Sequence, residues 1–116
     1  MLSSYIVMRP EPLRFKAFND ISFDYSNIGT PLQDSAILLH FQNETDGEIL
    51  ISWFDGIDHM FFPPGAFFVM DIAANQGTGG TMVAPTYTQF QIKAFDALPT
   101  LGTFYITALT SYGGPQ

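Results

Sequence analysis

The sequence predicts an all-β fold, a single antiparallel β-sandwich or jelly-roll domain with an extended N-terminal arm. Its 116 residues suit one domain with one core. Eight prolines and ten glycines divide the chain into pieces too short for long helices. Most of these pieces alternate apolar and polar residues and favour β-branched and aromatic side chains, which fit a pleated strand. We therefore expect the arm over residues 1–12 and the sandwich over residues 13–116.

The predicted strands follow one another in short segments along the domain. In the clearest cases every second residue is apolar, so we expect inward faces made by Phe90, Ile92 and Ala94 and by Phe104, Ile106 and Ala108. A glycine-rich loop is expected over 73–81. The predicted strands are 13–18, a short one near Phe23, 36–42, 48–54, 59–62, 66–72, 88–94 and 103–110.

Residues 43–47 are predicted to join two of these strands as a β-hairpin. The turn contains Asp46-Gly47, and this pair supplies the positive φ that tight hairpins need. Segments 36–42 and 48–54 would then be partners, with Ile49, Ile51 and Trp53 facing inward. The competing interpretation is a helix over 32–42, because that window contains neither glycine nor proline.

The charge of the chain is low and unevenly distributed. Charged residues are 13% of the chain and the net charge is −7, against roughly 25% charged residues in a typical soluble domain. Four Lys and Arg in total argue against a nucleic acid or an anionic membrane as partner. The deficit indicates a surface that neighbouring subunits cover. Residues 17–92 contain no Lys or Arg.

Two sets of residues are candidate assembly contacts. Arg9, Arg14 and Lys16 give the N-terminal segment a positive charge, which would dock on the acidic body of a neighbouring copy or of its own chain. Several strands are also apolar on both faces, which is unusual in an antiparallel sandwich. Loops or other subunits would cover the second face, whose candidates are Leu38, His40, Phe68 and Met70.

No group of residues predicts an enzyme, a cofactor or a metal. The chain has no cysteine and two histidines, and it lacks the Gly-x-Ser-x-Gly turn of a serine nucleophile. Residues 55–59 (DGIDH) contain three potential ligands, fewer than calcium or a closed zinc site requires. An ordinary turn explains them, and whether it binds an ion stays open. Residues 77–80 (GTGG) lack the lysine of a phosphate-binding loop.

A carbohydrate-binding module is the alternative from another functional class. Aromatic rings provide stacking faces for sugars, although most of the aromatic residues here fall on inward strand positions. The rings that would serve are Trp53, Tyr5, Tyr25, Tyr87, Tyr105 and Tyr112.

An ordered series of short segments resembles a family of small structural proteins of tailed bacteriophages. The spacing departs from the family pattern at Trp53, an additional aromatic residue, and at Ile57, which alone separates Gly56 from Asp58. The segments are 17–22 (AFNDIS), 28–32 (IGTPL), 41–46 (FQNETD), 51–56 (ISWFDG), 58–59 (DH), 63–65 (PPG), 69–75 (VMDIAAN), 102–107 (GTFYIT) and 112–113 (YG).

The resemblance implies a virion component without enzymatic activity that is present in repeated copies, as a homo-oligomer. Capsid decoration (a cement protein bound to the major capsid protein) is the first expectation, and a neck or tail ring component is the second. Residues 1–10 lack the features of a signal peptide, and no segment reaches the length of a membrane span. We therefore expect synthesis in the host cytoplasm, followed by incorporation into the virion.

Overall fold

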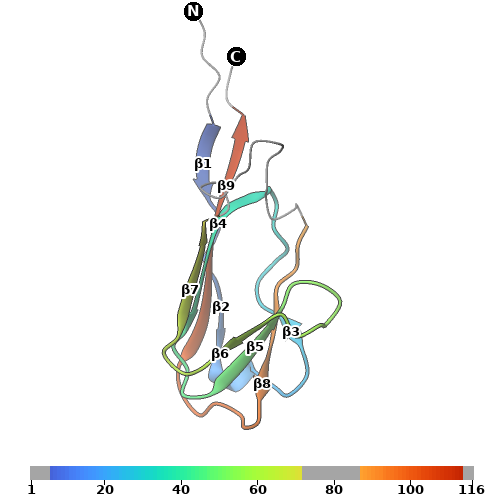
Figure 1. Cartoon of the computed structure of the whole chain (residues 1–116), viewed down its shortest axis with the longest axis vertical. Coiled ribbons are helices and arrows are strands. Elements are labelled where there is room, and N and C mark those ends of the chain that lie inside the picture. Colours follow the sequence, from blue (N-terminus) through green and yellow to red (C-terminus); the bar gives the residue numbers. More distant parts are fainter. Residues whose placement is uncertain (1–5, 72–86, 114–116) are drawn as a thin grey trace, which may run out of the picture.

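The protein is an antiparallel β-sandwich, as the sequence predicts. The structure, a computed structural model, describes residues 6–71 and 87–113 and contains two sheets (Figure 1). The five-stranded sheet has the order β1 (Ile6–Pro10), β9 (Thr103–Gly113), β4 (Ala36–Asn43), β7 (Phe67–Asp71), with β2 (Arg14–Ala17) also paired to β9. The four-stranded sheet has the order β3 (Ser26–Asn27), β8 (Gln91–Phe95), β5 (Glu48–Ser52), β6 (Met60–Phe62).

The core lies between the two sheets and is rich in aromatic side chains. Phe41 of β4 is fully buried, and its ring lies 6.0 Å from that of Phe62 and 5.9 Å from that of Phe90, centroid to centroid. Tilted and edge-on ring pairs at such distances add to the stabilisation from burial. The predicted inward positions are confirmed: the core includes Ile49, Ile51, Phe90, Ile92, Ala94, Phe104, Ile106 and Ala108.

The predicted hairpin between segments 36–42 and 48–54 is wrong. β4 pairs with β7 and β9, whereas β5 pairs with β6 and β8. The connection therefore crosses from one sheet to the other. Gly47 is not among the described glycines with positive φ, so Asp46-Gly47 does not form the expected turn. Instead, the buried side chain of Asn43 donates a hydrogen bond from Nδ2 to the Gly47 carbonyl at 2.9 Å and shapes the connection.

Part of the predicted N-terminal arm is a strand. β1 pairs with the end of β9, with Ile6 opposite Gly113 and Pro10 opposite Leu109. β2 follows it along the same side of β9. β1 and the end of β9 form a ribbon that projects beyond the rest of the sandwich (Figure 1). Residues 6–10 thus pair with their own chain, and residues 1–5 lie outside the described residues.

Three smaller predictions concern a helix, a short strand and a loop. Segment 36–42 is a strand, so the alternative helix over 32–42 is wrong, and a short 3-10 helix at Phe18–Asp20 is the helical element of the described chain. The short strand expected near Phe23 lies instead at β3. The glycine-rich loop at 73–81 falls outside the described residues. No helix in residues 6–71 and 87–113 has the length and hydropathy to span a membrane.

Gly102, which precedes β9, occupies a position that we expect no other residue to tolerate. Its φ is +92, and a Cβ atom there would lie 2.0 Å from the Glu44 carbonyl oxygen. Gly102→Ala should therefore lower the free energy of unfolding by about 2–3 kcal/mol, measured by urea denaturation. Gly56→Ala is the matched control, because Gly56 has a similar φ of +66 with no atom within 4 Å of the added Cβ. Equal losses in the two variants would contradict this prediction.

Candidate functional site

The outer face of the five-stranded sheet aligns its side chains in rows that run across three or four strands. Phe15 of β2 lies opposite Tyr105 of β9, Tyr105 opposite Gln42 of β4, and Gln42 opposite Phe67 of β7. Residues directly opposite each other share one face of a sheet. Because Phe41, the neighbour of Gln42, is buried in the core, this row faces away from the core.

Two further rows follow the same register. Thr107 lies opposite His40 and His40 opposite Val69, while Leu109 lies opposite Leu38 and Leu38 opposite Asp71. All of these side chains are at least partly exposed in the described part of the chain. We call this surface the outer sheet face. It consists of Phe15, Leu38, His40, Gln42, Phe67, Val69, Asp71, Tyr105, Thr107 and Leu109.

The two edges of the outer sheet face expose large apolar side chains. Phe15 is 62% exposed at one edge, and Phe67 and Val69 are 67% and 48% exposed at the other. Leu13, two residues before Phe15, is 51% exposed. With ~200 Å² for a phenylalanine side chain, the four present on the order of 400 Å² of apolar surface. Exposed apolar surface of this size at both edges of one sheet face is typical of a face that a partner covers.

The outer sheet face is nearly free of charge. Asp71, at one corner, is its single acidic residue, and it contains no Lys or Arg. His40 lies in the middle row, and its ring is 6.1 Å from that of Phe67, centroid to centroid. Eleven acidic residues give the chain its net charge of −7, so this lack of charge is a local property of the outer sheet face.

The structure separates the apolar residues that the sequence grouped together. Leu38 and His40 belong to the outer sheet face. Met70 and Phe68 lie opposite the buried residues Leu39 and Phe41, so they are on the inner side of the sheet. Met70 packs against the core, and Phe68 remains 42% exposed because β7 is an edge strand of the described sheet. The outward residues of β7 are its other two apolar ones, Phe67 and Val69.

The three basic candidates contact their own chain. Arg14 is 3% exposed, and its guanidinium donates to Glu11 at 2.7 Å and to the carbonyl oxygens of Thr30 and Pro31. Lys16 donates to the Asn27 carbonyl at 2.9 Å. Arg9 lies 4.0 Å from Asp34 and keeps an exposed side chain. Arg14 and Lys16 therefore hold the first strands against the domain, and we do not count them as assembly contacts.

The Glu11–Arg14 pair predicts how stability depends on pH. Burial alone would raise the pKa of Glu11, but hydrogen bonds from Arg14 and from the Asp34 and Gln33 N–H groups outweigh it and lower the pKa below the usual 4.5. A lowered folded-state pKa stabilises the fold above the unfolded-state pKa, and this contribution disappears as the pH falls through the folded value.

We therefore expect the free energy of unfolding to fall on acidification below about pH 4.5, and to fall less steeply in Glu11→Gln. Urea denaturation at a series of pH values between 7 and 3 measures both slopes. Asp20→Asn, at an exposed position, is the control and should keep the wild-type slope. A Glu11→Gln variant with the wild-type slope would contradict the prediction.

Residues 55–59 form a turn whose polar groups contact the protein itself. Asp58 accepts a hydrogen bond from the Tyr25 hydroxyl at 2.6 Å and lies 3.5 Å from the Lys93 ammonium. The Tyr25 hydrogen bond is the main reason that the pKa of Asp58 is lowered. The His59 ring stacks on that of Trp53 at 4.7 Å, centroid to centroid, and its Nδ1 accepts a hydrogen bond from the Trp53 backbone N–H. No cluster of three or more potential ligands for a metal occurs among the described residues.

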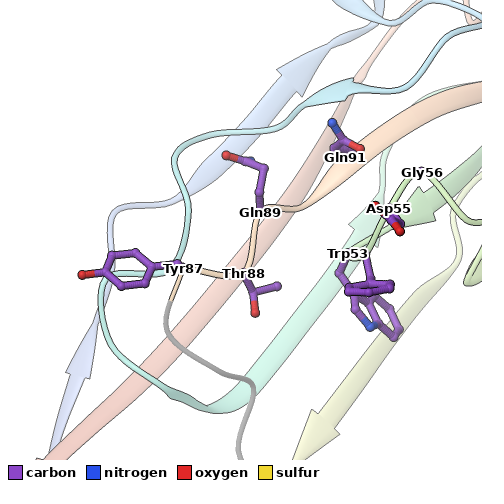
Figure 2. A pocket seen from close by; sticks show the side chains of 8 residues that line it. Trp53, Asp55, Gly56, Tyr87, Thr88, Gln89 and Gln91 are labelled. Atoms are coloured by element: carbon purple, nitrogen blue, oxygen red, sulfur yellow. The ribbon is translucent and has the colours of Figure 1, made fainter.

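A shallow depression of about 520 Å³ lies beside this turn. Trp53 and Asp55 lie on one side of it, and Tyr87 and Thr88 lie on the other, with Gln89 and Gln91 between (Figure 2). Phe54 and Gly56 complete the lining. All of these residues belong to the four-stranded sheet or its flanking segments. The sequence suggests Trp53 and Tyr87 as stacking rings for a sugar, but nothing in it indicates that the two glutamines lie close to them.

Comparisons with known proteins identify no relative of this chain. No family model matches the chain, and neither a curated protein nor a solved structure matches it.

Proposed function

We propose that the protein is a non-enzymatic structural subunit of a tailed-bacteriophage particle that attaches through its outer sheet face. The first candidate is a capsid decoration protein, or cement protein, bound to the major capsid shell. A neck or tail ring component is the second. The protein is made in the host cytoplasm, is present in repeated copies and ends in the virion.

The outer sheet face is the observation that carries this proposal. A chain with net charge −7 repels acidic partners and other copies of itself. Contact is least unfavourable where few charges must be desolvated, and the outer sheet face has a single carboxylate, at its corner. Its large apolar side chains stand at both edges, so a partner that covers both must cover the whole face.

The kind of particle is supported by the resemblance of the short ordered segments to phage structural proteins. Those segments fall on structural positions: IGTPL (28–32) supplies the buried residues Ile28 and Leu32, and GTFYIT (102–107) leads into β9 with Phe104 and Ile106 in the core. They would specify a fold rather than an active site, which agrees with a structural role.

Quantitative mass spectrometry of purified virions from the phage that encodes the protein tests this proposal. A copy number close to that of the major capsid subunit supports capsid decoration. A small fixed number per particle supports the neck or tail ring. Absence from the virion, with the protein present in the infected cell, would refute both.

A further inference from the structure

The depression beside Trp53 is separate from the outer sheet face. Its lining follows β5, precedes β8 or begins β8, which are strands of the four-stranded sheet. The outer sheet face belongs to the other layer of the sandwich and points away from the core on that side. A subunit attached through the outer sheet face would therefore keep the depression open to solvent.

The polar groups of the depression are mostly neutral and are held in place. The Gln89 side chain donates to the Gly29 carbonyl at 3.1 Å, and the Gln91 side chain donates to Asn27 Oδ1 at 3.0 Å. These bonds fix both amide groups, and none of the described hydrogen bonds occupies their side-chain oxygens. With the Asp55 carboxylate they provide several acceptors, and the described residues that line the depression include no Lys or Arg. These residues offer no positive charge to an anionic ligand, whereas they offer hydrogen-bond acceptors to the hydroxyl groups of a neutral ligand.

Three aromatic residues line the depression together with these acceptors. Phe54 is 65% exposed and Tyr87 is 80% exposed, while Trp53 is held in place by its stacking on His59 at 4.7 Å. The negative face of an aromatic ring attracts the weakly positive C–H groups of a sugar ring. In Figure 2 the Tyr87 ring points away from Trp53. Tyr87 and Trp53 therefore lie at different ends of the depression and would contact different parts of one ligand.

Two residues that line the depression, Asp55 and Tyr87, have a strained backbone with positive φ. Asp55 has a φ of 61 and Tyr87 a φ of 70, and the described chain has one other non-glycine residue with positive φ. Aspartate tolerates this conformation, but a bulky residue such as tyrosine rarely adopts it. Strain of this kind gathers at binding sites, where a side chain must be presented in one direction.

We propose that this depression binds a neutral oligosaccharide. The amide oxygens and Asp55 accept hydrogen bonds from sugar hydroxyl groups, and the exposed rings of Phe54 and Tyr87 stack on sugar rings. This activity goes beyond attachment to a particle, since it would let an attached subunit hold a glycan on the side opposite its docking face.

Binding to an array of neutral oligosaccharides with hexose, N-acetylhexosamine and deoxyhexose ends is the first test, with the full chain as the probe. For each glycan bound, titration with the fluorescence of Trp53 follows, since Trp53 is the one tryptophan of the protein. We expect a saturable change in that fluorescence. No binding to any glycan on the array would overturn the proposal.

Two variants locate the site without endangering the fold. Tyr87→Gly removes the ring and relieves the positive φ, so it should keep or raise the melting temperature while it weakens binding at least tenfold. Asp55→Asn removes the charge at a φ that asparagine also tolerates, and should weaken binding severalfold. Leu98→Gln, at an exposed residue outside the depression, is the control with unchanged affinity. Wild-type affinity in both site variants would overturn the proposal.

Discussion

Phe67→Asp and Phe15→Asp are each expected to reduce the number of copies per virion at least tenfold. The two side chains are the ends of one row across the outer sheet face, 67% and 62% exposed. A carboxylate in either place would lose its water when a partner covers the face. That desolvation costs several kcal/mol, and 1.4 kcal/mol already corresponds to a factor of ten in affinity. Complementation of a phage that lacks the gene, followed by mass spectrometry of the virions, measures the effect.

A matched control separates docking from solubility or folding. Phe23→Asp makes the same change at a residue that is 53% exposed and lies in a bend before β3, outside the outer sheet face. It should be incorporated like the wild type, and all three variants should show the wild-type circular dichroism spectrum. If Phe15→Asp and Phe67→Asp were incorporated normally, the outer sheet face would not be the docking surface.

Alternation along single strands predicts most of the fold. Phe104, Ile106 and Ala108 are buried as expected, because a strand between two layers must point every second side chain into the core. The same rule fails at β7, where the first four residues are all apolar and only the final Asp71 is polar. A run of apolar residues does not show which side chains face the core and which face outward. The pairing with β4 decides it and turns Phe67 and Val69 outward.

The partners of each strand are less predictable than its position. Asp46-Gly47 has the composition of a hairpin turn, yet the chain crosses there between sheets. The deciding contacts come from distant residues: Asn43 also donates to the carbonyl oxygens of Phe62 and Pro63. Arg14 is a similar case, because an arginine between apolar neighbours reads as exposed, yet it is buried and donates to the carbonyl oxygens of Thr30 and Pro31. Such long-range pairs have no local signal.

Asn43 bonds to both connections between the two sheets, the one from β4 to β5 and the one from β6 to β7. Nδ2 donates to Gly47, just before β5, and to Phe62 and Pro63, at the end of β6. The Asn43 backbone bonds to Ala66 and Gly65, which lead into β7. One residue thus fixes the crossing from β4 to β5 and the return from β6 to β7. It thereby sets the register of β7, and with it the edge of the outer sheet face.

Asn43→Ala should therefore lower the free energy of unfolding by about 3–5 kcal/mol, a large share of the 5–15 kcal/mol of a typical domain. The loss comes from the Phe62 carbonyl oxygen and the Thr45 N–H, which both lose a partner in a buried place, and from the part-buried bond to the Pro63 carbonyl oxygen. Asn43→Asp should be at least as harmful although it keeps the shape, because it sets a carboxylate against those carbonyl oxygens. Urea denaturation followed by Trp53 fluorescence measures both.

Gln42→Ala is the control for this prediction. Gln42 is the preceding residue on the same strand and also carries an amide, but it faces outward and is partly exposed. Its truncation should change the free energy of unfolding by less than about 1 kcal/mol. If Asn43→Ala lost no more than Gln42→Ala, the two crossings would be held by other contacts. If Asn43→Asp matched the wild type, then the shape of the side chain, and not donation from Nδ2, would hold β7 in its register.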